Sequence, residues 1–201
     1  MPNSVYSPIV GGSVQDSYYD QMASALSGDV YSPADYALVD SDVVSSAIGV
    51  TGLPAGVAVV VTNATGNSRP GINEKVVTFP TQSTDIVSGI TVRNQQMQSN
   101  INGAACWFSG RMCSVMRVHR IGGRMWVKLA SGTAVKGGLV YALTDGTGGI
   151  TSVAQGNALI RGAAFASAGT GIVLVEFGLS QSTTFRTVLM TGQTVSLSAM
   201  L

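Results

Sequence analysis

Short apolar runs rich in β-branched residues recur along the middle of the chain, and turns that contain glycine separate them. The clearest runs are residues 57–62, 75–79, 139–143 and 172–179. Runs of this length at close spacing are typical of β-sandwiches and barrels. The sequence therefore predicts an all-β fold, namely a single β-sandwich or a barrel-like, jelly-roll-like domain. Hydrophobic residues make up 45% of the chain, enough to build a core.

A β-hairpin is predicted where residues 114–121 and 124–129 flank Gly122-Gly123, because a two-residue glycine loop suits a primed turn. Met116 would then face Leu129, and the inner face would be apolar. The opposite face would carry Arg117, His119, Arg124, Trp126 and Lys128. Arg117 would lie opposite Lys128, and like charges directly across a hairpin repel, so we expect this face to lie beside an anionic partner or a neighbouring strand that carries acidic residues. The alternative is a solvated face with Trp126 partly tucked into the fold.

Both ends of the chain differ from this central region. Asp16 or Ser17 could cap a short helix that ends near Gly28, so residues 1–27 are predicted to be an arm with a helix. Residues 28–179 form the predicted β-rich domain, and residues 180–201 a strand-prone arm that lacks charge after Arg186. We expect this second arm to add a strand to a neighbouring subunit. The residues expected to make this contact are Val188, Leu189, Met190, Val195 and Leu197.

Charged residues are scarce and unevenly placed. They make up 10% of the chain, where soluble domains average roughly 25%. Residues 1–68 contain six aspartates and no lysine or arginine, whereas residues 86–144 contain seven basic residues and no acidic one. The acidic and basic segments can pair within one fold or between copies.

No pattern of catalytic, cofactor-binding or metal-binding residues is found. His119 is the one histidine, and no nucleophile elbow or phosphate-binding loop is present. Cys106 and Cys113 fit no common zinc spacing, so we expect two free thiols. The most apolar stretch is interrupted by Thr51 and Pro54, and no secretory signal is visible. The sequence predicts no membrane association and a protein that stays where it is made.

The order of several glycine and valine motifs resembles the structural cement, or head decoration, proteins of tailed bacteriophages. The motifs are Gly28-Asp29-Val30 with the aspartate-rich segment up to Val44, then residues 53–60, 86–93, 118–127, 137–141 with Asp145-Gly146, and 160–177. The helix-like start and the extension after residue 179, which is uncharged beyond Arg186, depart from the family pattern.

This resemblance implies a non-enzymatic cement protein that binds the outside of an assembled head at symmetry axes and strengthens it against internal pressure. The implied partners are the major capsid protein and further copies of the chain, with a trimer expected ahead of a dimer. It also implies a place on the capsid surface of the virion after synthesis in the host cytoplasm. No cofactor, nucleic acid or membrane is expected.

Two other classes of protein remain open on the sequence. An adhesive or receptor-binding β module of a virion has the same composition of strands and glycines. A nucleic-acid-binding β-ribbon protein would use the cations and the tryptophan of residues 117–128 to contact phosphates and stack on bases.

Overall fold

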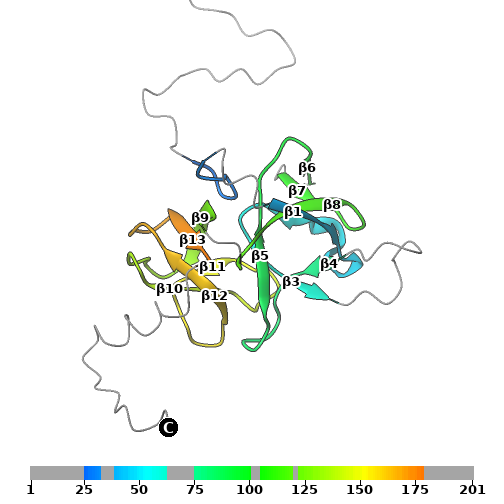
Figure 1. Ribbon diagram of the computed structural model, residues 1–201. Helices are drawn as coiled ribbons and strands as arrows, with labels where there is room; N and C mark the ends of the chain where they lie inside the picture. Colours follow the sequence, from blue (N-terminus) through cyan, green and yellow to red (C-terminus); the bar gives the residue numbers. More distant parts are fainter. Residues whose placement is uncertain (1–24, 33–38, 63–74, 101–104, 120–121, 179–201) are drawn as a thin grey trace, which may run out of the picture.

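The computed structural model describes residues 25–32, 39–62, 75–100, 105–119 and 122–178. Strands dominate this part of the chain, and most of them belong to two closed barrels that lie side by side (Figure 1). The prediction of an all-β, barrel-like fold is confirmed, with the strands divided between the two barrels. Each of the runs predicted at residues 57–62, 75–79, 139–143 and 172–179 contains a strand.

The first barrel is closed in the order β1-β4-β3-β5-β8. Its strands are β1 (Val39–Val44), β3 (Ala58–Thr62), β4 (Val76–Thr78), β5 (Val87–Thr91) and β8 (Met112–Arg117). A 3-10 helix, η2 (Ser46–Thr51), follows β1 and is capped by the Ser45 side chain. A small sheet lies beside this barrel in the order β2-β7-β6, formed by β2 (Leu53–Pro54), β7 (Ala105–Trp107) and β6 (Gln98–Ser99).

The second barrel is closed in the order β10-β11-β9-β13-β12. Its strands are β9 (Arg124–Ser131), β10 (Leu139–Ala142), β11 (Ile150–Thr151), β12 (Ala158–Phe165) and β13 (Ile172–Phe177). The two barrels share one topology. In each, the first strand runs parallel to the third and antiparallel to the fifth, and the second strand pairs with the third and the fourth.

Matching backbone hydrogen bonds within each barrel show which residues of the two barrels are equivalent. Gly56 N–H donates to Thr91 C=O at the start of β3, and Gly137 N–H donates to Phe165 C=O at the start of β10. The second and fourth strands of both barrels also show a shift of register soon after this point. The chain therefore contains two copies of one five-stranded unit, which the sequence analysis did not detect.

The apolar core is continuous between the barrels. One buried cluster fills the second barrel and extends to side chains of the first, among them Ile90 and Met116. A smaller cluster fills the first barrel and includes Val59, Val77 and Trp107. In β8 the alternation of a strand explains this division, because Val115 points into its own barrel while Met116 points to the neighbouring one.

The strap, residues 25–32, joins the barrels on one side (blue in Figure 1). Gly28 N–H donates to Trp126 C=O at 2.8 Å, and Trp126 N–H donates to Asp29 C=O at 2.8 Å, which fixes the strap to β9. Arg93 N–H donates to Gly28 C=O at 2.8 Å, which fixes it to the end of β5. Elsewhere, Ala58 N–H of the first barrel donates to Gly148 C=O of the second at 2.8 Å.

The predicted hairpin around Gly122-Gly123 is wrong. β8 pairs with β1 and β5, whereas β9 pairs with β11 and β13, so Met116 lies opposite Val39 and Ile90 instead of Leu129. The Gly-Gly pair lies in the connection from one barrel to the next. The physical reason is that closure of each barrel occupies both edges of both strands, which leaves no edge for a hairpin.

The predicted helix before Gly28 and the arm residues Val188, Leu189, Met190, Val195 and Leu197 lie outside the described residues. Within the part of the chain that the structure describes, no helix has the length and apolar character needed to cross a membrane.

Substitution of Gly28 tests the close approach of the strap to the first barrel. Gly28 has φ +88°, and an added Cβ would lie 2.6 Å from Ala55 Cβ and 2.9 Å from Gly56 N. We expect Gly28→Ala to lower the free energy of unfolding by about 3 kcal/mol, from left-handed strain together with overpacking. Denaturant-induced unfolding followed by circular dichroism measures the change.

Gly146→Ala is the matched control, because Gly146 has φ +84° and an added Cβ would meet nothing within 4 Å. It should cost about 1 kcal/mol, from backbone strain alone. Equal costs for the two variants would show that the strap does not depend on this contact.

Candidate functional site

Arg117 lies inside the first barrel and not on a surface. Its side chain is 2% exposed, and its guanidinium is bound by two carboxylates of β1. Nε is 3.1 Å from Asp40 Oδ2, and Nη2 donates to Asp42 Oδ1. The predicted position of Arg117 on an exposed face opposite Lys128 is therefore wrong. The aspartate-rich segment and the basic segment pair within the fold at this point.

This ion cluster, formed by Asp40, Asp42 and Arg117, occupies positions that are apolar in the second barrel. The shared register places Arg117 at the position of Phe177, which pairs with Ala163 as Arg117 pairs with Gly89. The same register matches Asp40 with Met125 and Asp42 with Val127. All three of these counterparts, Met125, Val127 and Phe177, are fully buried.

Only one of the two carboxylate oxygens of Asp42 has a hydrogen-bond partner among the described residues. Asp42 is 1% exposed, and its Oδ2 has no hydrogen-bond partner among the described residues. Burial raises the pKa of Asp42, and the charge of Arg117 acts in the opposite direction without cancelling this effect. Removal of one partner from such a cluster leaves an uncompensated buried charge, which costs more than the cluster itself contributes. We interpret Arg117 as a structural residue.

The outer face of β9 carries the other predicted cations. Arg124, Trp126 and Lys128 alternate with the buried residues Met125, Val127 and Leu129, so these three share one outward face as the sequence predicted. On the neighbouring strand β13 they lie opposite Glu176, Leu174 and Ile172, respectively. Lys128 is exposed and forms no ion pair with the described residues.

Tyr31 of the strap joins this face, and the sequence analysis missed it. The guanidinium carbon of Arg124 lies 4.3 Å from the centre of the Tyr31 ring, within the range of a cation–π contact. The ring centroids of Tyr31 and Trp126 are 6.2 Å apart with an interplanar angle of 43°. We call Tyr31, Arg124, Trp126 and Lys128 the contact face. Tyr31 is 47% exposed although it is a large aromatic residue.

No sequence pattern pointed to Tyr31, because its place depends on the backbone pairing between the strap and β9. Tyr31 N–H donates to Arg124 C=O at 3.0 Å, and Val30 forms a bridge with Met125. His119, the remaining predicted contact residue, is exposed and follows β8 in the connection between the barrels.

The contact face suits a partner that is acidic and partly apolar. Two exposed or half-exposed rings give flat apolar area with little loss of side-chain entropy, and interfaces are enriched in tyrosine, tryptophan and arginine. Lys128 adds a charge that no described carboxylate offsets. The positions of β1 that are equivalent to Arg124, Trp126 and Lys128 hold Val39, Ser41 and Val43. The first barrel therefore has no cation at these positions.

The cysteines form no disulfide. Cys106 and Cys113 are free and buried. Burial, with a smaller effect from Asp42, raises the pKa of Cys113 to about 12. Burial also raises the pKa of Cys106. Among the described residues, no three histidine, cysteine or acidic side chains gather closely enough to hold a metal ion.

Comparisons with known proteins give one matching family and a solved chain of similar fold. The family model described as structural cement protein (E217 gp24/Pam3 gp6) matches residues 14–179. A solved chain from the capsid of Myoviridae phage XM1 is similar in fold, with a TM-score of 0.52. The two chains are 16% identical, and the match covers 82% of this chain and 97% of that one. No curated protein matches the sequence.

Replacement of the ion cluster by the residues of the second barrel tests its structural role. We expect Arg117→Phe alone to lower the free energy of unfolding by about 3–5 kcal/mol, because it leaves two carboxylates without their cationic partner. The triple variant Asp40→Met, Asp42→Val, Arg117→Phe should come within about 1 kcal/mol of the parent protein or exceed it. Denaturant unfolding measures both variants. A triple variant as unstable as Arg117→Phe would contradict this interpretation.

Thiol accessibility tests the burial of the cysteines. At pH 8 a thiol with a pKa of about 12 is ionised in about one molecule in ten thousand, and only the thiolate reacts. We expect Cys113 of the folded protein to react with an aromatic disulfide reagent no faster than the protein unfolds, and both thiols to react at once in denaturant. Rapid release of two equivalents of the coloured thiol from the folded protein would show that Cys113 is accessible.

Proposed function

The chain belongs to the structural cement protein family of phages, and from this premise we propose that it binds the outside of an assembled head at symmetry axes. The family places the protein at the capsid in a structural role. Binding at symmetry axes would strengthen the head against the internal pressure of packaged DNA. A protein that binds the assembled state and not the free subunits stabilises assembly by mass action, and many copies multiply the effect.

The contact face is the observation that carries this proposal. Tyr31, Trp126 and Arg124 form a connected group of rings and a guanidinium, and Lys128 continues it along β9. We propose that this face, together with His119, contacts an acidic surface of the major capsid protein. Rings and arginine in the centre of an interface contribute most of its binding energy. Arg117 has no part in this contact because the ion cluster buries it.

Self-association is a further part of the proposal. We propose a homo-oligomer, with a trimer ahead of a dimer, because a closed ring matches the symmetry of a capsid axis. Residues 28–179 would be the cement domain and residues 1–27 an arm with a helix. Residues 180–201 would be an arm, uncharged after Arg186, that pairs with a neighbouring subunit through Val188, Leu189, Met190, Val195 and Leu197.

Substitutions on the contact face test the proposal. We expect Trp126→Ala to weaken binding to heads that lack the protein by about thirtyfold, because a central ring is worth about 2 kcal/mol. Lys128→Glu should also weaken binding to heads, and more strongly at low salt, since it places like charge against an acidic surface. Co-sedimentation of each variant with purified heads over a range of concentrations gives the affinity.

Lys136→Glu is the matched control, because Lys136 is exposed in the connection between β9 and β10 and outside the contact face. It should bind heads as the parent protein does. Full binding by the double variant Trp126→Ala, Lys128→Glu would refute the role of this face. Binding to DNA or to a cell-surface glycan in the absence of heads would instead favour one of the other classes of protein.

A further inference from the structure

The connection between the fourth and fifth strands is much longer in the first barrel than in the second. Residues 92–111 join β5 to β8, whereas residues 166–171 join β12 to β13. Because the second barrel closes with the short connection, closure does not require the long one. We call residues 92–111 the insertion. It contains β6 and β7, and long connections that a fold does not need are commonly functional.

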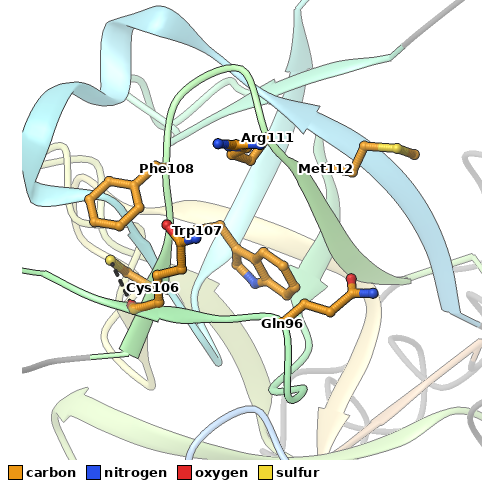
Figure 2. A pocket seen from close by; sticks show the side chains of 7 residues that line it. Gln96, Cys106, Trp107, Phe108, Arg111 and Met112 are labelled. Atoms are coloured by element: carbon orange, nitrogen blue, oxygen red, sulfur yellow. Dashed lines mark hydrogen bonds between the residues drawn. The ribbon is translucent and has the colours of Figure 1, made fainter.

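A pocket of about 230 Å³ opens between the insertion and the start of β8 (Figure 2). Its apolar lining residues are Cys106, Trp107, Phe108 and Met112, and its polar lining residues are Gln96, Gln98 and Arg111. Met112 is 60% exposed although it is apolar. The volume is enough for a side chain or two of a bound peptide and too small for most cofactors.

The indole of Trp107 carries a hydrogen-bond donor without an acceptor. Trp107 is 3% exposed, and its Nε1 has no partner among the described residues. A buried donor left unpaired costs about 1–3 kcal/mol, and such groups are rare in folded proteins. An acceptor brought by a ligand would remove this cost.

Arg111 is the one charged residue among the side chains that line the pocket. The described parts of residues 94–112 are otherwise rich in amides and apolar side chains, and no described carboxylate lies within ion-pair distance of Arg111. Arg93 and Arg117 differ in this respect, because each forms an ion pair with at least one aspartate. A guanidinium without an ion-pair partner, in a pocket that is also lined by apolar side chains, favours a ligand that carries a carboxylate.

We propose that this pocket is a second docking site, which binds a short acidic peptide segment of a partner protein. A side-chain carboxylate of the peptide binds Arg111, an oxygen of the peptide accepts the Trp107 indole N–H, and an adjacent apolar side chain packs against Phe108 and Met112. The site lies on the first barrel and the contact face on the second, so one molecule can hold two partners. This inference does not depend on how the contact face binds heads.

Titration of the isolated full chain with a probe peptide tests the site. The probe is acetyl-Gly-Leu-Asp-Leu-Gly-amide, and the readout is the NMR signal of the Trp107 indole N–H, which the variant Trp126→Phe distinguishes from that of the second tryptophan. We expect the signal to shift with saturation at millimolar peptide. The peptide with asparagine in place of aspartate should bind about tenfold more weakly, because a charge-assisted hydrogen bond is lost.

Two variants separate a specific contact from general attraction of an acidic peptide. Arg111→Gln should weaken binding of the probe about tenfold. Arg161→Gln removes an exposed arginine of β12 in the second barrel and should leave binding unchanged. The proposal is overturned if the Trp107 signal does not move, if the asparagine peptide binds equally well, or if both variants have the same effect. None of these outcomes bears on binding to heads.

Discussion

Pairing of the first strand with the last is the constraint on which both barrels depend. It joins β1 to β8 and β9 to β13, and it decides which side chains face inward. In the second barrel this pairing brings Met125, Val127 and Phe177 together as a dry core. In the first barrel the same geometry brings Asp40 and Asp42 to Arg117, so the closing strands are held by charge inside and by backbone hydrogen bonds along their edges.

The alternation of apolar and polar residues was enough to predict the strands and the outward face of β9, but not the partners of the strands or the burial of Arg117. Arg124, Trp126 and Lys128 face outward as the alternation predicted, because a strand has two sides whatever it pairs with. The hairpin failed because residues on either side of Gly122-Gly123 show the same alternation in a hairpin and in a link between two barrels. Only the long-range pairing, which involves strands far along the chain, distinguishes the two cases.

The repeated barrel escaped sequence reasoning for a related reason. Equivalent core positions need only to be filled, so the two copies can diverge until little similarity remains. Even the apolar character is lost where Arg117 stands in place of Phe177. Tyr31 and the pocket beside Trp107 were missed because each is made by a segment that lies against a distant strand. The family resemblance succeeded where these failed, because it relied on the order of motifs along the chain.

The strap has a mechanical consequence. A covalent link alone would let the two barrels swing about the connection between β8 and β9. The strap is hydrogen-bonded to β9 and to the residue that follows Val92, and a separate backbone bond joins Ala58 to Gly148. Two bodies tied at separate points cannot pivot about any one of them. A force applied to one barrel is therefore transmitted to the other with little bending between them.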